Sequence, residues 1–393
     1  MPLDARLAAV GLPGTRLIPA GWAVRSRWAL KRSGSGRPSP VRAEARDEGR
    51  ALFAGLNAIP QRTTLTEYSI QVDPTLAGPL RPRWYPAAAE RSEAVRLGGS
   101  IDLDFHTIPY PGDPARWPKP EVSQRRRRPR GVLTVRARDA DARLFCQADA
   151  PIRQETPNEA MLRLVDYGKA PTEKVPKELV FDRRFTVYAH LAKLAAQGID
   201  FIPLRRRHAS LIEHMDNLDQ SAWRPIRLTN RGRAYRTPRI ADETVQLRGY
   251  PRPLRQIIVK GLGHDQPTGL ITNQMKQSAA QLVDRYARRM IMENVLSEAI
   301  DFFHMDVLSS AVPMRINVDG PRTVMASVLY RLLGARVGEG YEKVESRPIY
   351  RDRVRHSGTV TLADDEIRVR LRARSQTHYL VSAGFPERRQ RIP

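Results

Sequence analysis

The sequence predicts an α/β protein in which a mixed β-sheet is flanked by helices. Between about residues 100 and 208 of the 393-residue chain, strand-like and helix-like segments follow one another as β-β-β-α-β-α-β. Apolar residues make up 41% of the chain, which is enough for a folded core, and no apolar run is long enough to span a membrane. Three antiparallel strands followed by parallel ones are the element order of an RNase H-like fold, and we expect that fold here.

The first hundred residues predict a separate region. Residues 1–50 are rich in Arg, Pro, Gly and Ser, so we expect a basic, Pro/Ser-rich arm that is poorly ordered. Short helical patterns over 51–98, at "EGRALFAGLNAI" and "AAAERSEAVRLG", predict a helical N-terminal region.

Residues 99–208 predict the first part of the core. The strands are "SIDLDFHTI", "RGVLTVRARD", "ARLFCQAD", "KELVFD" and "IDFIPLRRR". One helix begins after Pro157 and Asn158, and a second, "TVYAHLAKLAAQG", ends at Gly198.

The remainder is expected to interrupt the core and then complete it. Segments such as "PIRLTN", "ETVQLRG", "RQIIVKGL" and "TGLITN" predict a β-rich insertion over 209–273. A long helix from about Gln274 to Ser310 and another after Pro321 make 274–340 the second part of the core, with the catalytic helix. Residues 341–393 predict a basic C-terminal strand region, in which "EIRVRLRARS" packs one face and shows arginines on the other.

The charge favours a polyanionic partner. Lys and Arg number 66 against 42 Asp and Glu, a formal charge of +24, and nucleic acid is the commonest partner for such an excess. The single cysteine, Cys146, excludes an internal disulfide framework and a Cys-based zinc cluster, so we expect a reducing cytoplasm. Neither a phosphate-binding glycine loop nor a dinucleotide fingerprint is present, so no nucleotide cofactor is predicted.

Acidic residues mark the candidate site. Asp102 and Asp104 share one face of the first strand, since strand side chains alternate, and Asp182 ends the fourth strand. Any one of these alone is more often a turn or capping residue. In an RNase H-like core, carboxylates stand on the first strand, at the end of the fourth strand and on the helix after the fifth. Here those points hold Asp104, with Asp102 beside it, Asp182 and Glu293.

Three sequence blocks resemble the insertion-sequence DDE transposases, of the class with a Tyr-Arg-Glu signature. They are "IDLDFHTIPYPG", "LVFDRRFTVYAHLAKLAAQGIDFIPLRRR" and "YARRMIMENV", and together they cover roughly residues 98–335. In the family, the first Asp precedes an Ile-Pro-Tyr element by a few residues, which favours Asp104 over Asp102. Tyr286, Arg289 and Glu293 fit the signature Tyr-x2-Arg-x3-Glu and face one side of a helix.

The resemblance implies a function and its groups. Asp104, Asp182 and Glu293 would be catalytic residues that hold Mg²⁺ (or Mn²⁺), expected as two ions, for cleavage at element ends and 3′-hydroxyl strand transfer into target DNA. Tyr286 and Arg289 would contact DNA phosphate. The implied partners are double-stranded terminal inverted repeats and target DNA, bound by a homodimer in which the helical N-terminal region, 51–98, contacts DNA. No membrane is implied, and the expected setting is bacterial and nucleoid-associated. Ile300 replaces a signature Lys, so Arg288 or a more distant Lys makes that contact, or strand processing is weaker and the excision route differs.

Further basic and aromatic residues are candidates for DNA contact. They are Arg125, Arg126, Arg127 and Arg128 between the first two strands, Arg205, Arg206 and Arg207 after the fifth, and Trp223, which could stack on a displaced base. Solvated loops and a packed core Trp are the alternatives. Two other functions remain open: an RNase H-fold nuclease or resolvase, and a decayed transposase copy that only binds DNA.

Overall fold

The computed structural model divides into two compact units, which are described separately: residues 1–84 with 296–393 form unit 1, and residues 85–295 form unit 2. The boundary after Val295 falls inside the segment 274–340 that we expected to complete the core. The structure describes the following residues: 11–34, 47–56, 59–71, 99–109, 131–141, 144–149, 159–172, 175–228, 237–261, 266–289, 297–305, 313–363 and 366–384. None of the helices in these ranges is long and apolar enough to cross a membrane.

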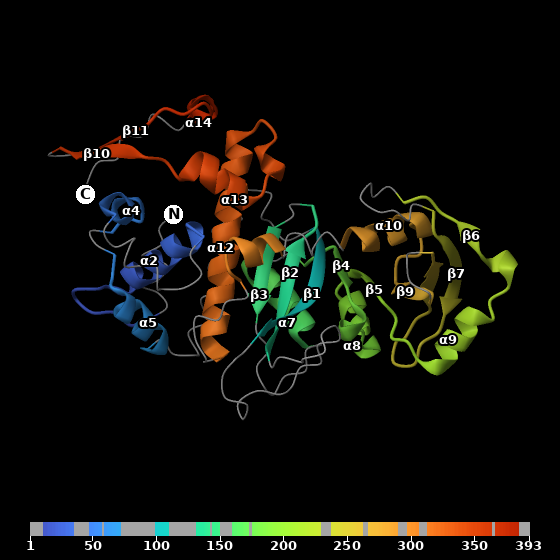
Figure 1. Ribbon diagram of the computed structural model, residues 1–393. Coiled ribbons are helices and arrows are strands. Elements are labelled where there is room, and N and C mark those ends of the chain that lie inside the picture. Colours follow the sequence, from blue (N-terminus) through green and yellow to red (C-terminus); the bar gives the residue numbers. More distant parts are fainter. Residues whose placement is uncertain are drawn as a thin grey trace. The chain divides into compact units, whose positions relative to one another are not determined.

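Unit 2 contains a five-stranded mixed sheet with the order β3-β2-β1-β4-β5. β1, β2 and β3 pair antiparallel, whereas β4 runs parallel to β1 and β5 parallel to β4 (Figure 1). This confirms the predicted order of three antiparallel strands followed by parallel ones. The elements are β1 (Ser100–Pro109), β2 (Gly131–Asp139), β3 (Leu144–Asp149), α7 (Glu159–Thr172), β4 (Glu178–Phe181), the 3₁₀ turn η4 (Arg183–Phe185), α8 (Tyr188–Ala196) and β5 (Asp200–Pro203).

A second sheet of four strands follows in unit 2, with the order β6-β7-β8-β9. It adjoins the first sheet where Leu204 bridges Leu270, just after β5. Its elements are α9 (Ala209–Asp216), the 3₁₀ turn η5 (Gln220–Ala222), β6 (Arg224–Pro225), β7 (Arg239–Val245), β8 (Leu254–Lys260), β9 (Thr268–Thr272) and α10 (Ala279–Arg289). β8 and β9 lie where we expected them, whereas β7 begins before "ETVQLRG" and the helix α9 was not predicted.

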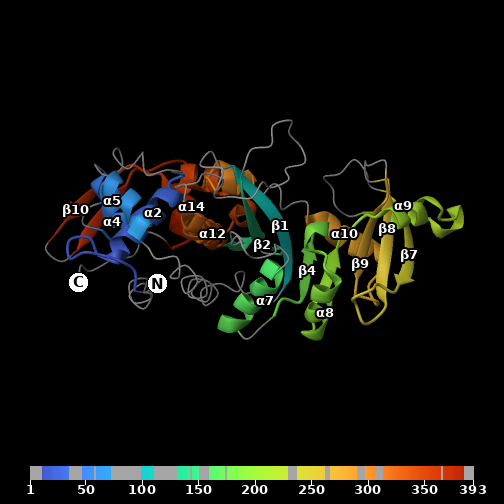
Figure 2. The same ribbon diagram turned by 90° about the horizontal axis from the view of Figure 1, so that it is seen from below.

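The two faces of the five-stranded sheet differ in character. Ile101 and Leu103 of β1, with Leu179 and Phe181 of β4, pack into one apolar cluster together with residues of α7 and α8. The opposite side of β4 and β5 packs against α10 in a second cluster (Figure 2). Because strand side chains alternate, Ser100, Asp102 and Asp104 point to the side that α10 covers.

The start of α10 is set by a reciprocal cap. The backbone N–H of Gln281 donates to Oγ of Ser278 at 3.2 Å, and that of Ser278 donates to Oε1 of Gln281 at 3.0 Å. This capping box begins the helix at Ala279, so the prediction that it starts at Gln274 was wrong.

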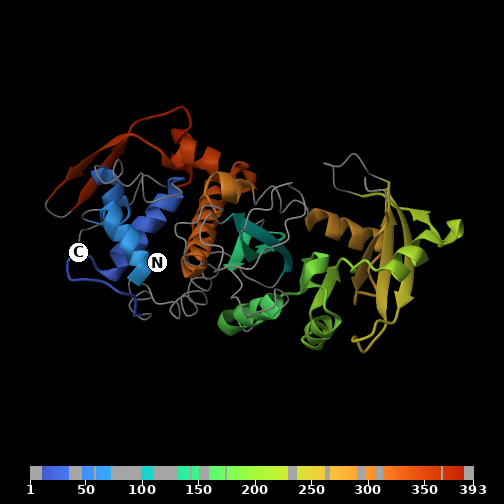
Figure 3. The same ribbon diagram turned by 60° about the horizontal axis from the view of Figure 1, so that its bottom comes forward.

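Unit 1 is helical with one small hairpin (Figure 3). Its elements are α2 (Ala20–Arg32), α4 (Glu48–Phe53), α5 (Arg62–Gln71), α12 (Pro313–Val337), the 3₁₀ turn η6 (Tyr341–Lys343), α13 (Ser346–Ile349), the π-helical turn η7 (Tyr350–Val354), β10 (Gly358–Leu362), β11 (Ile367–Leu371) and α14 (Thr377–Ser382).

Unit 1 departs from the sequence predictions in three places. α2 lies within the predicted arm and buries Ala23, Val24 and Leu30, so that expectation was wrong for residues 20–32. α12 begins at Pro313 and continues through Pro321 rather than starting after it. The apolar side of the hairpin is open: Val360, Leu362, Val369 and Leu371 are all at least 38% exposed, although we expected this face to pack.

Candidate active site

The candidate site lies where β1 and β4 run side by side. The parallel register pairs Leu103 with Phe181, so the next residues along, Asp104 and Asp182, come opposite each other. Neighbouring strands are about 4.8 Å apart, which brings the two carboxylates into one neighbourhood although 78 residues separate them. Asp182 has extended backbone angles directly after β4, and its Oδ1 accepts the backbone N–H of Arg183 at 2.7 Å.

Arg289, at the end of α10, contacts Asp104, and Tyr286 lies beside Arg289. Nη2 of Arg289 lies 2.8 Å from Oδ1 of Asp104, and its Nε donates to the carbonyl of Leu103 at 3.1 Å. Its guanidinium carbon lies 5.9 Å from the ring centre of Tyr286. Of the predicted site residues, Asp104, Asp182, Tyr286 and Arg289 thus lie in one neighbourhood, and their roles stay predictions.

The electrostatics of both α10 side chains support the same placement. Burial lowers the pKa of Arg289, but Asp104 and Asp182 favour its charged form, and the net shift is upward. Burial raises the pKa of Tyr286; Arg289 opposes that rise, whereas Asp182 and Asp104 add to it. Both carboxylates thus act on both residues, and Tyr286 keeps its phenolic proton at neutral pH.

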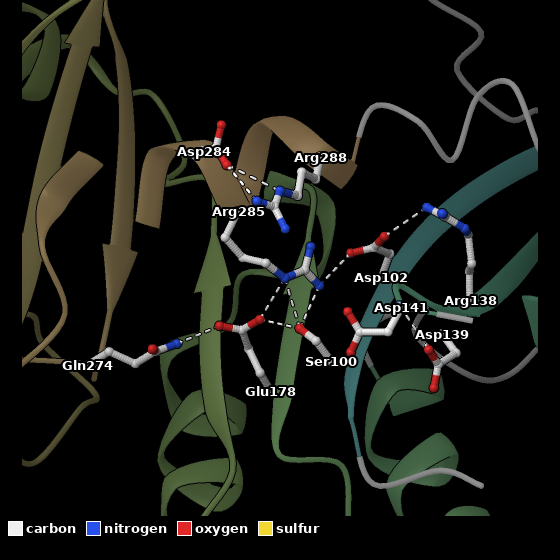
Figure 4. A network of polar contacts seen from close by, with 10 residues as sticks. All are labelled: Ser100, Asp102, Arg138, Asp139, Asp141, Glu178, Gln274, Asp284, Arg285 and Arg288. Atoms are coloured by element: carbon white, nitrogen blue, oxygen red, sulfur yellow. Dashed lines mark hydrogen bonds and ion pairs between the residues drawn. The ribbon is translucent and has the colours of Figure 1, made fainter. Parts of the chain in front are cut away.

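A buried polar network holds α10 against the sheet one turn earlier (Figure 4). Arg285 donates from Nη2 to Oδ1 of Asp102 and from Nε to Oε1 of Glu178, both at 2.8 Å, and from both nitrogens to Oγ of Ser100. Arg138 of β2 donates to Oδ2 of Asp102 at 3.1 Å, and Gln274 donates to Oε2 of Glu178 at 2.7 Å. The network therefore joins α10 to three strands.

The two acids of β1 have different environments. Asp102 is completely buried, and both of its oxygens accept from guanidinium groups. Burial raises the pKa of Asp102, while Arg285 and Arg138 oppose the rise. Asp104 keeps 29% of its side chain exposed. Asp102 is thus a structural anchor, and Asp104 is the carboxylate that a ligand can approach.

The spacing of these contacts follows from helix and strand geometry. Arg285 and Arg289 are four residues apart on α10, which corresponds to a rise of about 6 Å. Asp102 and Asp104 are two residues apart on β1, which corresponds to about 6.6 Å. The two distances are nearly equal, so Arg285 can pair with Asp102 while Arg289 pairs with Asp104. Sequence reasoning missed Arg285 and Glu178, although the equal spacing of both pairs was a usable signal.

The arginines after β5 lie at the same edge of the sheet. Because Pro203 pairs with Phe181, residues 205–207 follow β5 on the side where Asp182 follows β4. Arg205 turns into the four-stranded sheet and donates to the buried Gln256. Arg206 is exposed and donates to the carbonyls of Arg183 and Arg184, which are themselves exposed. The exposed Arg207 donates to Gln266 and Pro267. Arg183 and Arg184 were missed in the sequence.

Several predicted site residues lie outside the described residues or elsewhere. Glu293 and Arg125, Arg126, Arg127 and Arg128 are outside the described residues. Within the described part of the chain, no three Asp, Glu, His or Cys side chains form a metal-binding group, so the acids that come together are a pair. Trp223 is only 6% exposed, packs with Leu211 and Ile258 in an apolar cluster, and is covered by the ammonium of Lys260 at 3.7 Å. The packing of Trp223 therefore agrees with the interpretation of it as a core residue rather than as a base-stacking one.

The pair fits a divalent cation by its chemistry. Two carboxylates at adjacent strand ends supply the hard oxygen donors that Mg²⁺ and Mn²⁺ prefer. Asp104 already faces a positive charge at 2.8 Å, which shows that its oxygen is oriented toward a cation.

Comparisons with known proteins are sparse. No model of a known protein family matches the sequence, and no curated protein matches it. Among solved structures, the chain is similar to one described as the cryo-EM structure of piggyBac transposase synaptic complex with hairpin DNA. The TM-score is 0.47 and the identity 11%, over 88% of this chain and 75% of that chain.

Proposed function

We propose that the chain is a DNA transposase of the insertion-sequence DDE type, built on an RNase H-like core. The supporting observation is that Asp104 and Asp182 are brought side by side by the β1–β4 register, with Tyr286 and Arg289 against them. The sheet order β3-β2-β1-β4-β5, with its mixed strand directions, supports the core assignment. Glu293, four residues after Arg289 in the sequence, is the proposed third acid.

The proposed roles follow from chemistry and position. Asp104, Asp182 and Glu293 would hold Mg²⁺ or Mn²⁺, proposed as two ions. Bound there, these ions would activate a water or a 3′-hydroxyl and stabilise the leaving oxygen of an in-line displacement at phosphorus. The protonated Tyr286 and the charged Arg289 are hydrogen-bond donors suited to a phosphate beside the pair. Arg206 and Arg207 extend positive charge along the same edge and would hold the DNA backbone.

The proposed substrate is double-stranded DNA. Water would first cleave one strand at each element end, and the freed 3′-hydroxyl would then attack a target phosphodiester, so that one P–O bond forms as another breaks. Because two ends are joined to one target, we propose that a homodimer holds them.

A strand-transfer assay tests this proposal. The purified chain is incubated with labelled duplexes carrying the inverted repeats that flank its gene, a target plasmid and Mg²⁺ or Mn²⁺. Joined product is the expected result. Cleavage without joining would instead support a nuclease or resolvase, and a shifted band without any chemistry would support a copy that only binds DNA.

A further inference from the structure

Arg289 occupies the position from which a cation would bind Asp104. Its Nη2 lies 2.8 Å from Oδ1 of Asp104, while its Nε donates to the carbonyl of Leu103 next to that carboxylate. Only 11% of the Arg289 side chain is exposed, compared with 29% of Asp104. The same Oδ1 also accepts the backbone N–H of Phe105 at 2.9 Å, so this oxygen is held toward Arg289.

The guanidinium is placed there by the packing of α10. One turn earlier, Arg285 is fixed to Ser100, Asp102 and Glu178, which sets the height and rotation of the helix against β1. Arg289 then reaches Asp104, because four residues along α10 and two residues along β1 advance by about the same distance. The Arg289 side chain is therefore held by packing, whereas the neighbouring Arg288, which pairs with Asp284, is 59% exposed.

A divalent cation at Asp104 competes with this contact. Mg²⁺ binds carboxylate oxygen at about 2.0–2.1 Å, well inside the distance at which Arg289 now sits. A guanidinium cannot lose its charge at physiological pH, so it cannot yield by deprotonation. Two positive groups on one partly buried oxygen repel each other strongly. On the oxygen that Arg289 now holds, Oδ1, only one of the two can bind.

We propose that Arg289 is a built-in competitor of the divalent cation at Asp104: it neutralises the charge of this carboxylate and occupies its Oδ1, so that an ion can take this oxygen only if Arg289 turns away. This inference rests on the proposed function. It gives Arg289 a second role besides phosphate contact, because it sets how tightly the metal is held. In this scheme, the affinity of the site for metal is limited by the cost of displacing Arg289.

Direct metal binding tests the inference without any measure of catalysis. Free Mn²⁺ is followed by electron paramagnetic resonance during titration of the full-length chain, the Arg289→Gln variant and the Arg288→Gln variant. We expect Arg289→Gln to bind Mn²⁺ about tenfold more tightly, equivalent to about 1.4 kcal/mol. Arg288→Gln is the matched control: it removes the same charge one residue away, from a side chain that is 59% exposed, and should change the affinity less than twofold.

Further variants separate the possible failures. If circular dichroism shows that Arg289→Gln does not fold, Arg289→Lys replaces it. An ammonium lacks the fork that reaches both Leu103 and Asp104, so we expect a gain in Mn²⁺ affinity smaller than that of Arg289→Gln. Asp104→Asn should lose the Mn²⁺ site. If Asp104→Asn loses the site while the Arg289 variants bind no more tightly than wild type, the competition is refuted and the proposed function stands. If wild type and Asp104→Asn behave alike, the metal site itself is refuted, and the proposed function with it.

Discussion

At the scale of single residues, the contrast between Asp102 and Asp104 defines the site. Both lie on the same face of β1, and the alternation of the sequence could not distinguish them. Only the resemblance to a family favoured Asp104. Their environments differ because the partners of Asp102 come from β2 and α10, 36 and 183 residues away in the chain. A local pattern does not record contacts of that range.

The roles of Asp104 and Asp182 predict a loss of chemistry without a loss of fold. We expect Asp104→Asn and Asp182→Asn each to lower strand cleavage and joining by at least about 100-fold, because a metal-binding carboxylate is removed. Both side chains are partly exposed, and Arg289 keeps its bond to the carbonyl of Leu103, so thermal stability should fall less than in Asp102→Asn. The assay is the strand-transfer reaction with labelled ends. Joining that persists near the wild-type rate in either variant would contradict the assignment.

The buried Asp102, in contrast, is predicted to matter for the stability of the fold. Asp102→Asn leaves Arg138 and Arg285 buried without their full counter-charge, so we expect unit 2 to lose about 3–5 kcal/mol of stability. Hydrogen exchange of the β1 and β2 amides measures this loss, and Asp104→Asn is the matched control. Equal exchange in the two variants would show that Asp102 is no anchor.

At the scale of elements, the sequence predicted strands better than helix ends. The strands of the five-stranded sheet lie where alternation and turn residues placed them. α9 was missed because its eight residues lie in a stretch otherwise marked by short strands. The start of α10 was misplaced because apolar periodicity outweighed the Ser278–Gln281 capping box. Glu178 and Arg285 were missed: equal spacing relates the two arginines to the two aspartates, but which side chains meet depends on how α10 packs.

Arg285 is predicted to hold α10 on the sheet. Arg285→Gln removes its contacts with Asp102 and Glu178 and should destabilise the docked helix by about 3 kcal/mol. The amides of α10 should then exchange about 100-fold faster. Arg288→Gln on the same helix removes a guanidinium that is 59% exposed from its pair with the buried Asp284, and should cost no more than about 1 kcal/mol. Similar exchange rates in both variants would exclude this anchoring role.

Asp242 predicts how the four-stranded sheet responds to acid. Its pKa is lowered from 3.8 chiefly by the hydrogen bonds from Arg255, with burial opposing and Arg224 assisting. Because the folded-state pKa lies below the unfolded one, this stabilisation is complete above pH 3.8 and is lost as the pH falls toward the folded-state pKa.

The corresponding variant is Asp242→Asn. At neutral pH it should cost about 1 kcal/mol, allowing for solvent screening of a partly exposed pair. Hydrogen exchange in β7 and β8 measures this difference, which should shrink in buffers below pH 3.8. Asp216→Asn, at the exposed end of α9, is the control and should show no such trend. A difference that stays constant with pH would refute the ion-pair explanation.

At the scale of the whole molecule, composition predicted a polyanionic partner but not the two units. The formal charge of +24 is spread over the chain, and a count cannot say which arginines are already engaged. Arg138 and Arg285 form buried ion pairs with Asp102, whereas Arg206 and Arg207 are exposed. Nor could the sequence show that residues 296–393 form one compact unit with residues 1–84.

The exposed arginines predict a change in salt dependence. Replacing Arg206 and Arg207 together by Gln should reduce the slope of log K against log salt concentration by about 2, since each phosphate contact contributes about 0.9. Fluorescence anisotropy with a labelled duplex at several salt concentrations measures the slope. The control replaces Arg368 and Arg370 of β11 by Gln, because these two exposed arginines remove the same charge at another place in the chain. Arg351 and Arg353 are unsuitable for this purpose, since Arg353 packs on the ring of Tyr341. If both double variants change the slope equally, the edge beside Asp182 has no special part in binding.

The register between β1 and β4 has a consequence for how this chain can change. Asp104 and Asp182 meet only because backbone pairing keeps them level and on the same side of the sheet. A single residue inserted into β4 ahead of Asp182 would turn that carboxylate toward the opposite layer, beneath α7 and α8. We therefore expect the chain to accept inserted residues in the connections but not within β1 or β4. One extra residue in either strand would separate the two carboxylates, although both side chains would still be present.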